Sequence, residues 1–557
     1  MDNTKLAWEL MNRVRGRIPL EQLTDFVTSF AYSYCNNNNL IGGNETELIN
    51  IAEENLSRTP SDLKFDLEKL FCDFSLLEIK EVIYSVLFFK QRFMENTSDS
   101  LLSLSLSLLN IENDDTIFDL GSGLGTFLAG VYKHTLEKSI KIKSLSGVEI
   151  NYNQLAISRM ALEILTGDSD LKCDIKYLNI FTDRIESKYN KGFVYPPIGL
   201  RFMGSEVNYT TIIGNIQLTA RNTPEWIFID NLLSNLNGNK KRAVALISGR
   251  SLFNAADKEY RELLLNNGLI EGIIELPQGF IDIAAIKTFL IVFSTHNQVV
   301  KLLDASDYYT KDKITNNIKY NVDAIYNNYT SNEVKTKSIQ ELFELANWIP
   351  STALLDIISP KNGVKLSEIA NVFTGSQYTI RNFADKLAKT NTGYRLLTSS
   401  DIQDGSIDSN CLQSIYNDDS KLNKFAVMYN DVIITSKSSK IKIAVIDYEP
   451  KEKIIVTGGM IIVRPDQSKI NSTYLKIFLE SEQGQLVLKS IQKGMTIVTI
   501  NAKELSEIVI PLPSIKMQFK MANKYNSKLS SLWALKSEIS KIENDLKNIY
   551  YTEIEED

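Results

Sequence analysis

The chain has 557 residues, of which 43% are hydrophobic and 23% charged, a composition that is ordinary for a globular protein of about three or four domains. Its net charge of −7 excludes nucleic-acid binding through bulk charge, so any such contact must come from local basic faces. The N-terminal stretch MDNTKLAWEL lacks a basic segment followed by an apolar run. We therefore expect no signal peptide, and no apolar run is long enough to predict a membrane span.

The cysteines and histidines exclude several kinds of chemistry. Four cysteines are scattered without short spacings, which argues against a zinc site or a disulfide framework and indicates a reducing, cytoplasmic location. The two histidines, His134 and His296, fall on an expected helix surface and at an expected strand end. We therefore expect no metal site and no reaction that depends on a histidine base.

The first half of the chain changes from helical to alternating patterns. In residues 1–95, apolar residues recur at helical spacing. From about residue 112, apolar runs alternate with helical patterns such as residues 151–166 and 256–266, which predicts a mostly parallel, doubly wound sheet. The expected strands are residues 115–120, 144–150, 174–178, 210–214, 242–247, 269–276 and 286–293.

The second half predicts a β-rich region followed by one long helix. Residues 301–345 are polar and are expected to form a linker or an embellishment. The final helix has a heptad seam made of Leu532, Leu535, Ile539, Ile542, Leu546 and Ile549, with Tyr525 one heptad earlier. The sequence therefore predicts an α/β multidomain protein with domains at residues 1–95, 96–300, 301–345, 346–515 and 516–557.

A glycine-rich turn, DLGSGLG (residues 119–125), follows the first expected strand. Glycines let the backbone turn sharply and approach a ligand without clashes from Cβ. Glu149 ends the next expected strand, where an acidic residue accepts hydrogen bonds from ribose hydroxyls in dinucleotide-type folds. Asp119 would repel a pyrophosphate but suits a cationic ligand, which favours S-adenosylmethionine over NAD.

Several longer stretches are similar to one family. DLGSGLGTF, GVEINYNQLA and the segment from Arg242 to Ser294 resemble the modification subunit of type I restriction–modification systems, which is an adenine-N6 DNA methyltransferase. The stretch LAWELMNRVRG resembles the helical signature at the N-terminus of that subunit. The resemblance implies a Rossmann-like class I methyltransferase fold for residues 96–300, with S-adenosylmethionine as the cofactor.

The same resemblance assigns further cofactor contacts. Thr97, in MENTSDSLLSL, matches the family's Tyr-Thr-Pro, although Ser98 replaces the proline. Asn179 stands where the family usually has an aspartate beside the adenine ring, so we expect weakened binding. The expected cofactor-binding residues are Thr97, Asp119, Gly121, Gly123, Gly125, Glu149 and Asn179.

Residues 346–550 resemble about half of a type I specificity subunit, with one DNA target-recognition domain and one coiled-coil helix. This implies double-stranded DNA as a partner, and we expect Lys437, Lys440 and Lys442 to contact it. A single helix implies a homodimer or a partner with a similar helix. The chain has no nuclease or helicase motif, so a role in restriction–modification or anti-phage defence implies a separate nuclease or translocase subunit.

The family's catalytic loop reads Asn-Pro-Pro-aromatic, and its spacing from the glycine turn points to Asn215-Ile216-Gln217-Leu218. Asn215 fits, but Ile216 lacks the fixed φ of proline and Leu218 has no π face for stacking on a base. One interpretation is a DNA-binding pseudoenzyme with impaired methyl transfer. The alternative is an active, site-specific adenine methyltransferase with an unusual loop. A methyltransferase for a non-DNA substrate is disfavoured by the recognition domain.

Overall fold

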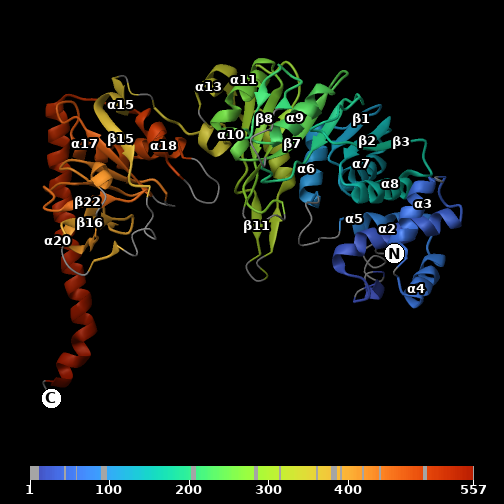
Figure 1. Cartoon of the computed structure of the whole chain (residues 1–557), viewed down its shortest axis with the longest axis horizontal. Helices are drawn as coiled ribbons and strands as arrows, with labels where there is room; N and C mark the ends of the chain where they lie inside the picture. Colours follow the sequence, from blue (N-terminus) through green and yellow to red (C-terminus); the bar gives the residue numbers. More distant parts are fainter. Residues whose placement is uncertain are drawn as a thin grey trace. The chain divides into compact units, whose positions relative to one another are not determined.

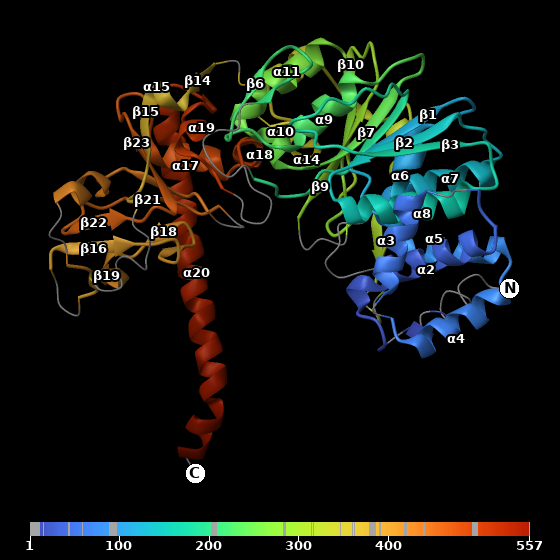
Figure 2. The same cartoon turned by 45° about the vertical axis from the view of Figure 1, so that its right-hand side comes forward.

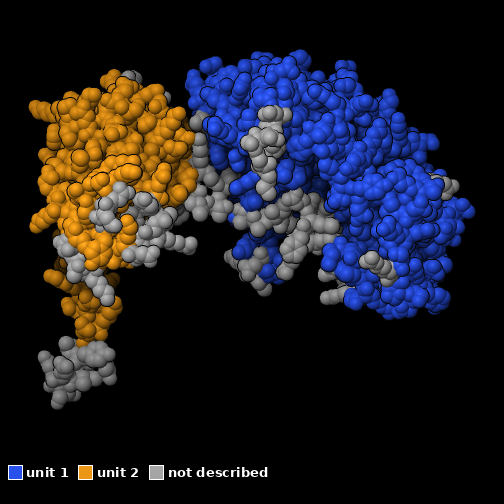
Figure 3. Space-filling view, in the orientation of Figure 1, with its two compact units in different colours: residues 1–354 blue, residues 355–557 orange. Residues whose placement is uncertain are grey.

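The computed structural model divides into two compact units, residues 1–354 and residues 355–557 (Figures 1 and 3). Within the residues that the structure describes, no helix combines the length and the apolar character that a membrane span requires. The described residues are 10–555, with only the backbone given for 20 and 549–555, and without residues 11, 15, 43–44, 58, 89–96, 202–208, 282–285, 313–314, 316, 346, 359, 361, 378–385, 389–391, 417–419, 438–440 and 493–498.

The N-terminal part of unit 1 is helical. Helix α5 begins at a capping box, in which the side chains of Ser75 and Glu78 each accept a backbone N–H of the other residue. Helices α2 and α5 pack against α8 (Tyr152–Thr166), so the helical layer adjoins the sheet-bearing part of the unit. The N-terminal helices are α2 (Leu23–Asn37), α3 (Thr46–Leu56), α4 (Ser61–Cys72) and α5 (Leu76–Leu87).

A nine-stranded sheet forms the centre of unit 1, with the strand order β13-β10-β8-β9-β7-β4-β1-β2-β3. The strands from β7 through β4, β1 and β2 to β3 are parallel, whereas β9 is antiparallel to β7 and β8, and β13 is antiparallel to β10. The sheet is therefore mixed. Its strands are β1 (Thr116–Leu120), β2 (Ser144–Glu149), β3 (Lys172–Tyr177), β4 (Lys191–Val194), β7 (Arg242–Ser248), β8 (Ile270–Glu275), β9 (Thr288–Phe293), β10 (Val299–Asp304) and β13 (Lys335–Ser338).

Residues 301–345 extend this sheet, although their polar composition predicts a linker or an embellishment. They contain most of β10, all of β13, and the helices α12 (Val322–Thr330) and α13 (Ile339–Glu344). Ile325 and Tyr329 of α12 are fully buried, so a few well-placed apolar residues are enough to fix the segment. The small hairpin β11 (Tyr309–Lys311) and β12 (Ile318–Tyr320) also belongs here.

The predicted sheet strand at residues 210–214 is wrong. Only β5 (Tyr209–Thr210) is extended there, and it pairs antiparallel with β6 (Gln217–Leu218) in a two-stranded hairpin separate from the main sheet. The place between β1 and β7 is taken by β4, which the sequence pattern did not predict.

Strand β4 escapes prediction because its four residues begin with Lys191 and Gly192. The Lys191 ammonium is buried, and it donates hydrogen bonds to the backbone oxygens of Asn110 (3.1 Å) and Lys240 (3.2 Å). A Cβ on Gly192 would lie 2.9 Å from the side chain of Leu232, so glycine permits the covering helix to approach. Lys191 thus satisfies buried backbone oxygens, and Gly192 leaves room for a helix, so both residues are suited to the centre of the sheet.

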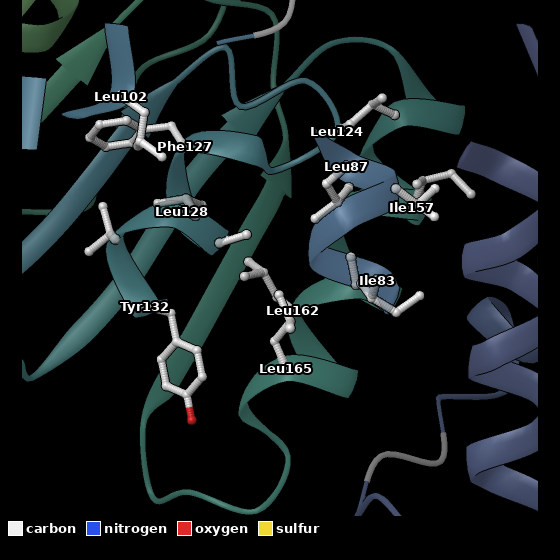
Figure 4. Close-up of a cluster of buried hydrophobic side chains, with 14 of the residues drawn as sticks. Ile83, Leu87, Leu102, Leu124, Phe127, Leu128, Tyr132, Ile157, Leu162 and Leu165 are labelled. Atoms are coloured by element: carbon white, nitrogen blue, oxygen red, sulfur yellow. The ribbon is translucent and has the colours of Figure 1, made fainter. Parts of the chain in front are cut away.

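Helices cover the faces of the sheet. Figure 4 shows Leu102 of α6 beside Phe127 of α7, in a cluster that continues to Leu162 and Leu165 of α8. A Cβ on Gly130 of α7 would lie 2.4 Å from Leu102, so a glycine allows α6 and α7 to pack closely. The other helices of the sheet-bearing part are α6 (Asp99–Leu109), α7 (Thr126–Lys138), α9 (Glu225–Ser234), α10 (Arg250–Phe253), α11 (Lys258–Asn266) and α14 (Pro350–Ala353).

Unit 2 is β-rich, as the sequence predicts. It contains a four-stranded sheet, β15-β23-β20-β21, and a three-stranded sheet, β19-β16-β22. The strands are β14 (Gly363–Lys365), β15 (Ala370–Thr374), β16 (Tyr394–Leu397), β17 (Ile402–Gln403), β18 (Ser406–Ile407), β19 (Gln413–Ser414), β20 (Val432–Thr435), β21 (Ile443–Val445), β22 (Lys453–Val456), β23 (Met460–Pro465) and β24 (Val509–Pro511). The helices before the last are α15 (Leu366–Ile369), α17 (Ser472–Glu480), α18 (Glu482–Ser490) and α19 (Ala502–Ser506).

The last helix, α20 (Ile515–Glu555), has 41 residues, which makes it about 60 Å long. Its first turns are held to the same unit, because the Tyr525 hydroxyl donates to Glu480 (2.8 Å) and the Gln518 amide donates to the backbone oxygen of Lys469 (3.2 Å). Its C-terminal part projects beyond the rest of the unit (Figure 1). The predicted seam lies on the surface, with exposed fractions of 47–63% for Leu532, Leu535, Ile539, Ile542 and Leu546, while the Ile549 side chain lies outside the described residues.

Candidate functional site

The carboxyl end of β1 leads into the glycine turn. Gly121, Gly123 and Gly125 have φ angles of +83°, +53° and +81°, in the left-handed region that favours glycine. A Cβ on Gly125 would lie 2.6 Å from Oγ of Ser158, so α8 closely approaches this end of the turn. At Gly121, no described atom lies within 4 Å of where a Cβ would be. The backbone of the turn is therefore open to a ligand at Gly121.

Glu149 ends β2 and fixes the turn. Its carboxylate accepts hydrogen bonds from the backbone N–H groups of Gly123 (2.8 Å), Ile150 (2.8 Å) and Asn151 (2.7 Å). A carboxylate offers about four lone-pair positions, so it retains capacity for a ligand hydroxyl. Glu149 thus joins the glycine turn to the end of the neighbouring strand.

Asp119, at the end of β1, is a buried carboxyl group, with 3% of its surface exposed. Among the described residues, no side chain or backbone group donates a hydrogen bond to it or forms an ion pair with it. Burial, and in second place repulsion from Glu149, raise the pKa of Asp119 well above its ordinary value. A cationic ligand at this edge would supply the missing positive charge.

Two exposed apolar residues extend this edge, and the sequence motifs did not reveal them. Ile150, directly after Glu149, is 51% exposed, and Phe181, shortly after β3, is 39% exposed. The side-chain oxygen of Asn179 accepts the backbone N–H of Phe181 (3.0 Å) and keeps a second lone pair. Because β2 and β3 are parallel neighbours, all of these residues follow carboxyl ends at one edge of the sheet. In the sequence, each of these apolar residues comes within two positions of a polar residue at or just after a strand end: Ile150 follows Glu149, and Phe181 follows Asn179.

Thr97 lies at the start of α6 and is buried, with 8% of its surface exposed. Among the described residues it makes no hydrogen bond, whereas Ser98 caps α6 by accepting the N–H of Leu101 (3.3 Å). Helix α6 contacts β4 and β7. The structure therefore places Thr97 just before a helix that packs on the sheet, and no described hydrogen bond joins it to the glycine turn.

The tetrapeptide from Asn215 to Leu218 lies in the β5–β6 hairpin. Asn215 is an exposed turn residue with a φ of +55°, and Leu218 is buried, with 1% of its surface exposed. Ile216 is held by Thr211, because its N–H donates to Thr211 Oγ1 (2.8 Å) and its oxygen accepts the Thr211 N–H (2.9 Å). The segment has the contacts of a folded hairpin turn and does not follow a strand of the main sheet.

Asp230 on α9 anchors this hairpin. Its fully buried carboxylate accepts the backbone N–H groups of Ile212 (2.7 Å) and Ile213 (3.0 Å) and the hydroxyls of Tyr209 (2.9 Å) and Tyr260 (2.8 Å). Burial raises the pKa of Asp230, and these hydrogen bonds oppose the rise. Two backbone N–H groups of the β-branched run that was predicted to be a sheet strand thus donate to a carboxylate and not to a neighbouring strand.

Another tetrapeptide, Tyr195-Pro196-Pro197-Ile198, directly follows β4. Val194, the last residue of β4, is in register with Leu120 of β1 on one side and Ala245 of β7 on the other. Because β1 and β4 are parallel, Tyr195 follows β4 at the level where Gly121 follows β1. A Pro-Pro pair therefore stands at the carboxyl edge beside the glycine turn. The signal in the sequence was the pair itself, after KGFV.

Trp226 and Tyr209 are aromatic residues close in sequence to the tetrapeptide at residues 215–218, but neither ring is free to replace the missing aromatic residue. Trp226 is fully buried and packs edge-on against Tyr260, with ring centroids 5.7 Å apart. The Tyr209 hydroxyl is bound to Asp230. Trp226 is therefore a core residue.

The structure separates the three lysines of the predicted DNA contact. Lys437 is exposed, and Lys440 lies outside the described residues. The Lys442 ammonium donates to the backbone oxygens of Ser399 (3.0 Å) and Ile402 (2.9 Å), so it joins two loops of unit 2. Of these three lysines, Lys437 alone is described as an exposed cation, because Lys440 is not described and Lys442 is partly buried.

Residues 96–353 match the N-6 DNA methylase family. The chain is also 29% identical, over 135 residues, to the type I restriction enzyme EcoBI specificity subunit of Escherichia coli; this match covers 24% of the chain and 28% of that relative's length. Solved structures with similar folds include a type I restriction-modification methyltransferase subunit from Streptococcus thermophilus (12% identity, TM-score 0.48, covering 61% of this chain and 96% of that one). Another is a modification subunit of a putative type I restriction enzyme from Vibrio vulnificus (16% identity, TM-score 0.40, covering 54% of this chain and 70% of that one).

The family match covers the strands β1 to β10, the glycine turn, Glu149 and the Pro-Pro edge. The chain therefore carries a domain of the N-6 DNA methylase family in residues 96–353, together with a segment similar to a type I specificity subunit.

Proposed function

We propose that this protein is a sequence-specific DNA-binding pseudoenzyme, which keeps the cofactor edge of an adenine-N6 methyltransferase but transfers methyl groups poorly. The observation that carries the proposal is the tetrapeptide at the end of β4, Tyr195-Pro196-Pro197-Ile198. We assign the catalytic position to these residues and not to Asn215–Leu218, because only the former follow a strand beside the glycine turn.

The altered side chains remove two interactions with the target base. In the enzymes that the chain resembles, the asparagine and the first proline carbonyl accept hydrogen bonds from the adenine amino group, and the aromatic ring stacks on the base. Tyr195 offers a phenol in place of an amide oxygen, and Ile198 has no π face. Lost stacking costs about 1–3 kcal/mol. A lost polar contact in the transition state costs about 10²- to 10³-fold. Together they lower the rate by about 10³- to 10⁵-fold.

The residues at the edge fit S-adenosylmethionine, the cofactor that the family implies. The open turn at Gly121 admits the ligand, Glu149 has capacity for ribose hydroxyls, and the buried carboxyl group of Asp119 can ionise beside the cationic end. Ile150 and Phe181 offer apolar surface for the adenine ring. When bound, the cofactor supplies the methyl group. The remaining acceptor of Asn179 is weaker than an aspartate, so we propose reduced affinity.

Cofactor binding should depend on pH through Asp119. Its raised pKa keeps the carboxyl neutral at low pH, so affinity for the cationic ligand should increase as the pH rises through that pKa, and binding should release a proton. Calorimetry in buffers of different ionisation enthalpy measures this proton. In Asp119→Asn, binding should be weaker and proton release absent. Equal proton release in wild type and variant would assign the effect to another group.

The experiment that tests the proposed function combines three measurements on the full chain. Calorimetry should detect S-adenosylmethionine binding that Glu149→Ala weakens, and a mobility-shift assay should detect duplex DNA binding. With both ligands present, N6-methyladenine should stay at background over hours. Binding of neither ligand, or rapid methylation, would contradict the proposal.

A second candidate is an active, site-specific adenine methyltransferase with an unusual loop. It is favoured by Pro196 and Pro197, which keep the first proline carbonyl and its fixed φ at the end of β4. Rapid methylation in the same assay would select it.

Unit 2 is the proposed target-recognition part. Similarity to a specificity subunit supports this role. We propose that Lys437 and its neighbourhood contact DNA, whereas Lys442 holds two loops of unit 2 together through its hydrogen bonds. We further propose that α20 pairs with α20 of a second copy, and that any cleavage or translocation of DNA is performed by a separate subunit of a defence system.

A further inference from the structure

Two exposed arginines, Arg221 and Arg250, lie side by side in unit 1. An Nη atom of Arg250 is 3.5 Å from the backbone oxygen of Arg221, to which Asn254 also donates (2.9 Å). In the part of the chain that the structure describes, neither guanidinium forms an ion pair with a carboxylate. Their segments, near β6, α9 and α10, occupy one end of unit 1 (Figure 2).

Three other arginines of unit 1 form ion pairs with carboxylates. Arg17 contacts Asp66 (3.1 Å), Arg242 contacts Glu271 (2.6 Å), and Arg159 contacts Glu45. Arg184 and Arg201 are also exposed and, among the described residues, form no ion pair, so the distinguishing feature of Arg221 and Arg250 is that the two residues are in contact with each other.

Hydrogen bonds to a buried carboxylate hold the backbone of the loop that carries Arg221. Asp257 is fully buried and accepts hydrogen bonds from the backbone N–H of Thr223 (2.9 Å) and the side-chain amide of Asn222 (3.0 Å). The Asn222 oxygen in turn accepts the backbone N–H of Thr219 (2.8 Å). Arg221 thus stands on a turn with a fixed backbone, and such preorganisation lowers the entropic cost of binding.

The segment that carries Arg250 is held in the same way. The buried Glu225 accepts the N–H of Ser248 (3.3 Å) and the hydroxyl of Ser251 (3.0 Å), and the Arg261 guanidinium donates to the backbone oxygen of Ser251 (2.9 Å). Burial raises the pKa of Glu225, as it does for Asp257, which favours the neutral forms beneath the arginines.

Arg250 lies at the carboxyl edge of the main sheet, next to the strand end that carries the proposed catalytic position. Arg250 comes two residues after Ser248, the last residue of β7, and β7 is the parallel neighbour of β4. The carboxyl end of β4 carries Tyr195. Two guanidinium groups without an ion pair, on backbone segments that hydrogen bonds hold in place, fit a phosphodiester backbone, because the planar fork of arginine binds phosphate oxygens bidentately.

We propose that Arg221 and Arg250 form a phosphate clamp, through which unit 1 itself holds duplex DNA beside the β4 edge, independently of the recognition contacts of unit 2. This inference rests on the proposed DNA-binding function. A phosphate clamp carries no sequence information, so it contributes equally to all duplexes.

The test measures duplex binding by the full chain as a function of salt, with labelled DNA of about 30 base pairs in specific and random sequences. Each of Arg221→Ala and Arg250→Ala should weaken binding about tenfold at about 0.1 M salt and lower the salt slope by about 0.9, with the same loss for every sequence. Replacement of both by lysine should keep the slope. Arg17→Ala, which removes a paired arginine far along the chain, is the matched control.

The outcomes separate the two proposals. A wild-type chain that binds no duplex would overturn the proposed function and the clamp together. A wild-type chain that binds DNA, with an unchanged salt slope in the folded Arg221→Ala and Arg250→Ala variants, would overturn the clamp alone. Tighter binding of a duplex RNA of equal length would overturn the assignment of DNA as the partner. Far-ultraviolet circular dichroism checks that the variants are folded.

Discussion

Methyl transfer to adenine should rise by about 10³- to 10⁵-fold when Tyr195 is replaced by asparagine and Ile198 by tyrosine in the same chain. The double variant supplies the amide acceptor and the stacking ring at the end of β4, while Pro196 and Pro197 already hold the backbone. Tritiated S-adenosylmethionine with excess protein and duplex DNA measures the single-turnover rate. Each single substitution should recover only part of the gain, because the two interactions act on the same base.

The control for this experiment is Asn215→Ala. If the tetrapeptide of the β5–β6 hairpin were the catalytic loop, this change would abolish any residual activity and prevent the gain. Since Asn215 is an exposed turn residue outside the main sheet, we expect it to leave both rates unchanged. A double variant that remains at background, with cofactor and DNA bound, would argue against the assignment to residues 195–198.

Replacement of Leu535 and Ile542 by glutamate should convert a dimer into a monomer at micromolar concentration. The seam side chains of α20 are about half exposed in a single chain, and burial of each is worth about 1.5–3 kcal/mol, which is enough for pairing after the cost of association. Two glutamates would place charges in that interface. Sedimentation velocity measures the change.

Ser537→Glu with Asn544→Glu adds the same charge on the opposite face of α20 and should leave the dimer intact. Point substitutions are sharper than truncation at about residue 515, because Gln518 and Tyr525 bind the first turns of α20 to their own unit. A wild-type chain that sediments as a monomer, unaffected by either pair, would contradict pairing through the seam. A dimer would present two recognition units, so its target should consist of two inverted half-sites.

The parts of the fold that were predictable are those where local pattern and tertiary role agree. The strand before Gly121, the glycine turn and Glu149 follow from sequence, because buried parallel strands are continuous apolar runs and a positive φ selects glycine. The prediction of a sheet strand at residues 210–214 was wrong because there the local pattern and the tertiary role disagree. Their β-branched run is hydrogen-bonded to Asp230, a partner 17–18 residues away that no local pattern reveals.

The proposed assignment of the catalytic position to residues 195–198 depends on β4, which the sequence did not predict because this strand is short and begins with a lysine that binds backbone oxygens distant in the sequence. Without that strand, spacing alone selected Asn215. Lys442 is a similar case: a basic run predicts solvated or DNA-facing cations, and only the packing of two loops shows that this ammonium is already bound. The burial of the Asp119 carboxyl group, which raises its pKa, and the exposure of Ile150 likewise depend on the assembled edge.

The central claim is that the family's cofactor edge is kept while the residues that act on adenine are altered. Base-modification sequencing of host DNA, with and without the gene, tests it most directly. We predict no N6-methyladenine that depends on the gene, and its appearance within a two-part motif when the Tyr195→Asn, Ile198→Tyr variant is expressed. Gene-dependent N6-methyladenine with the wild-type chain alone would contradict the account.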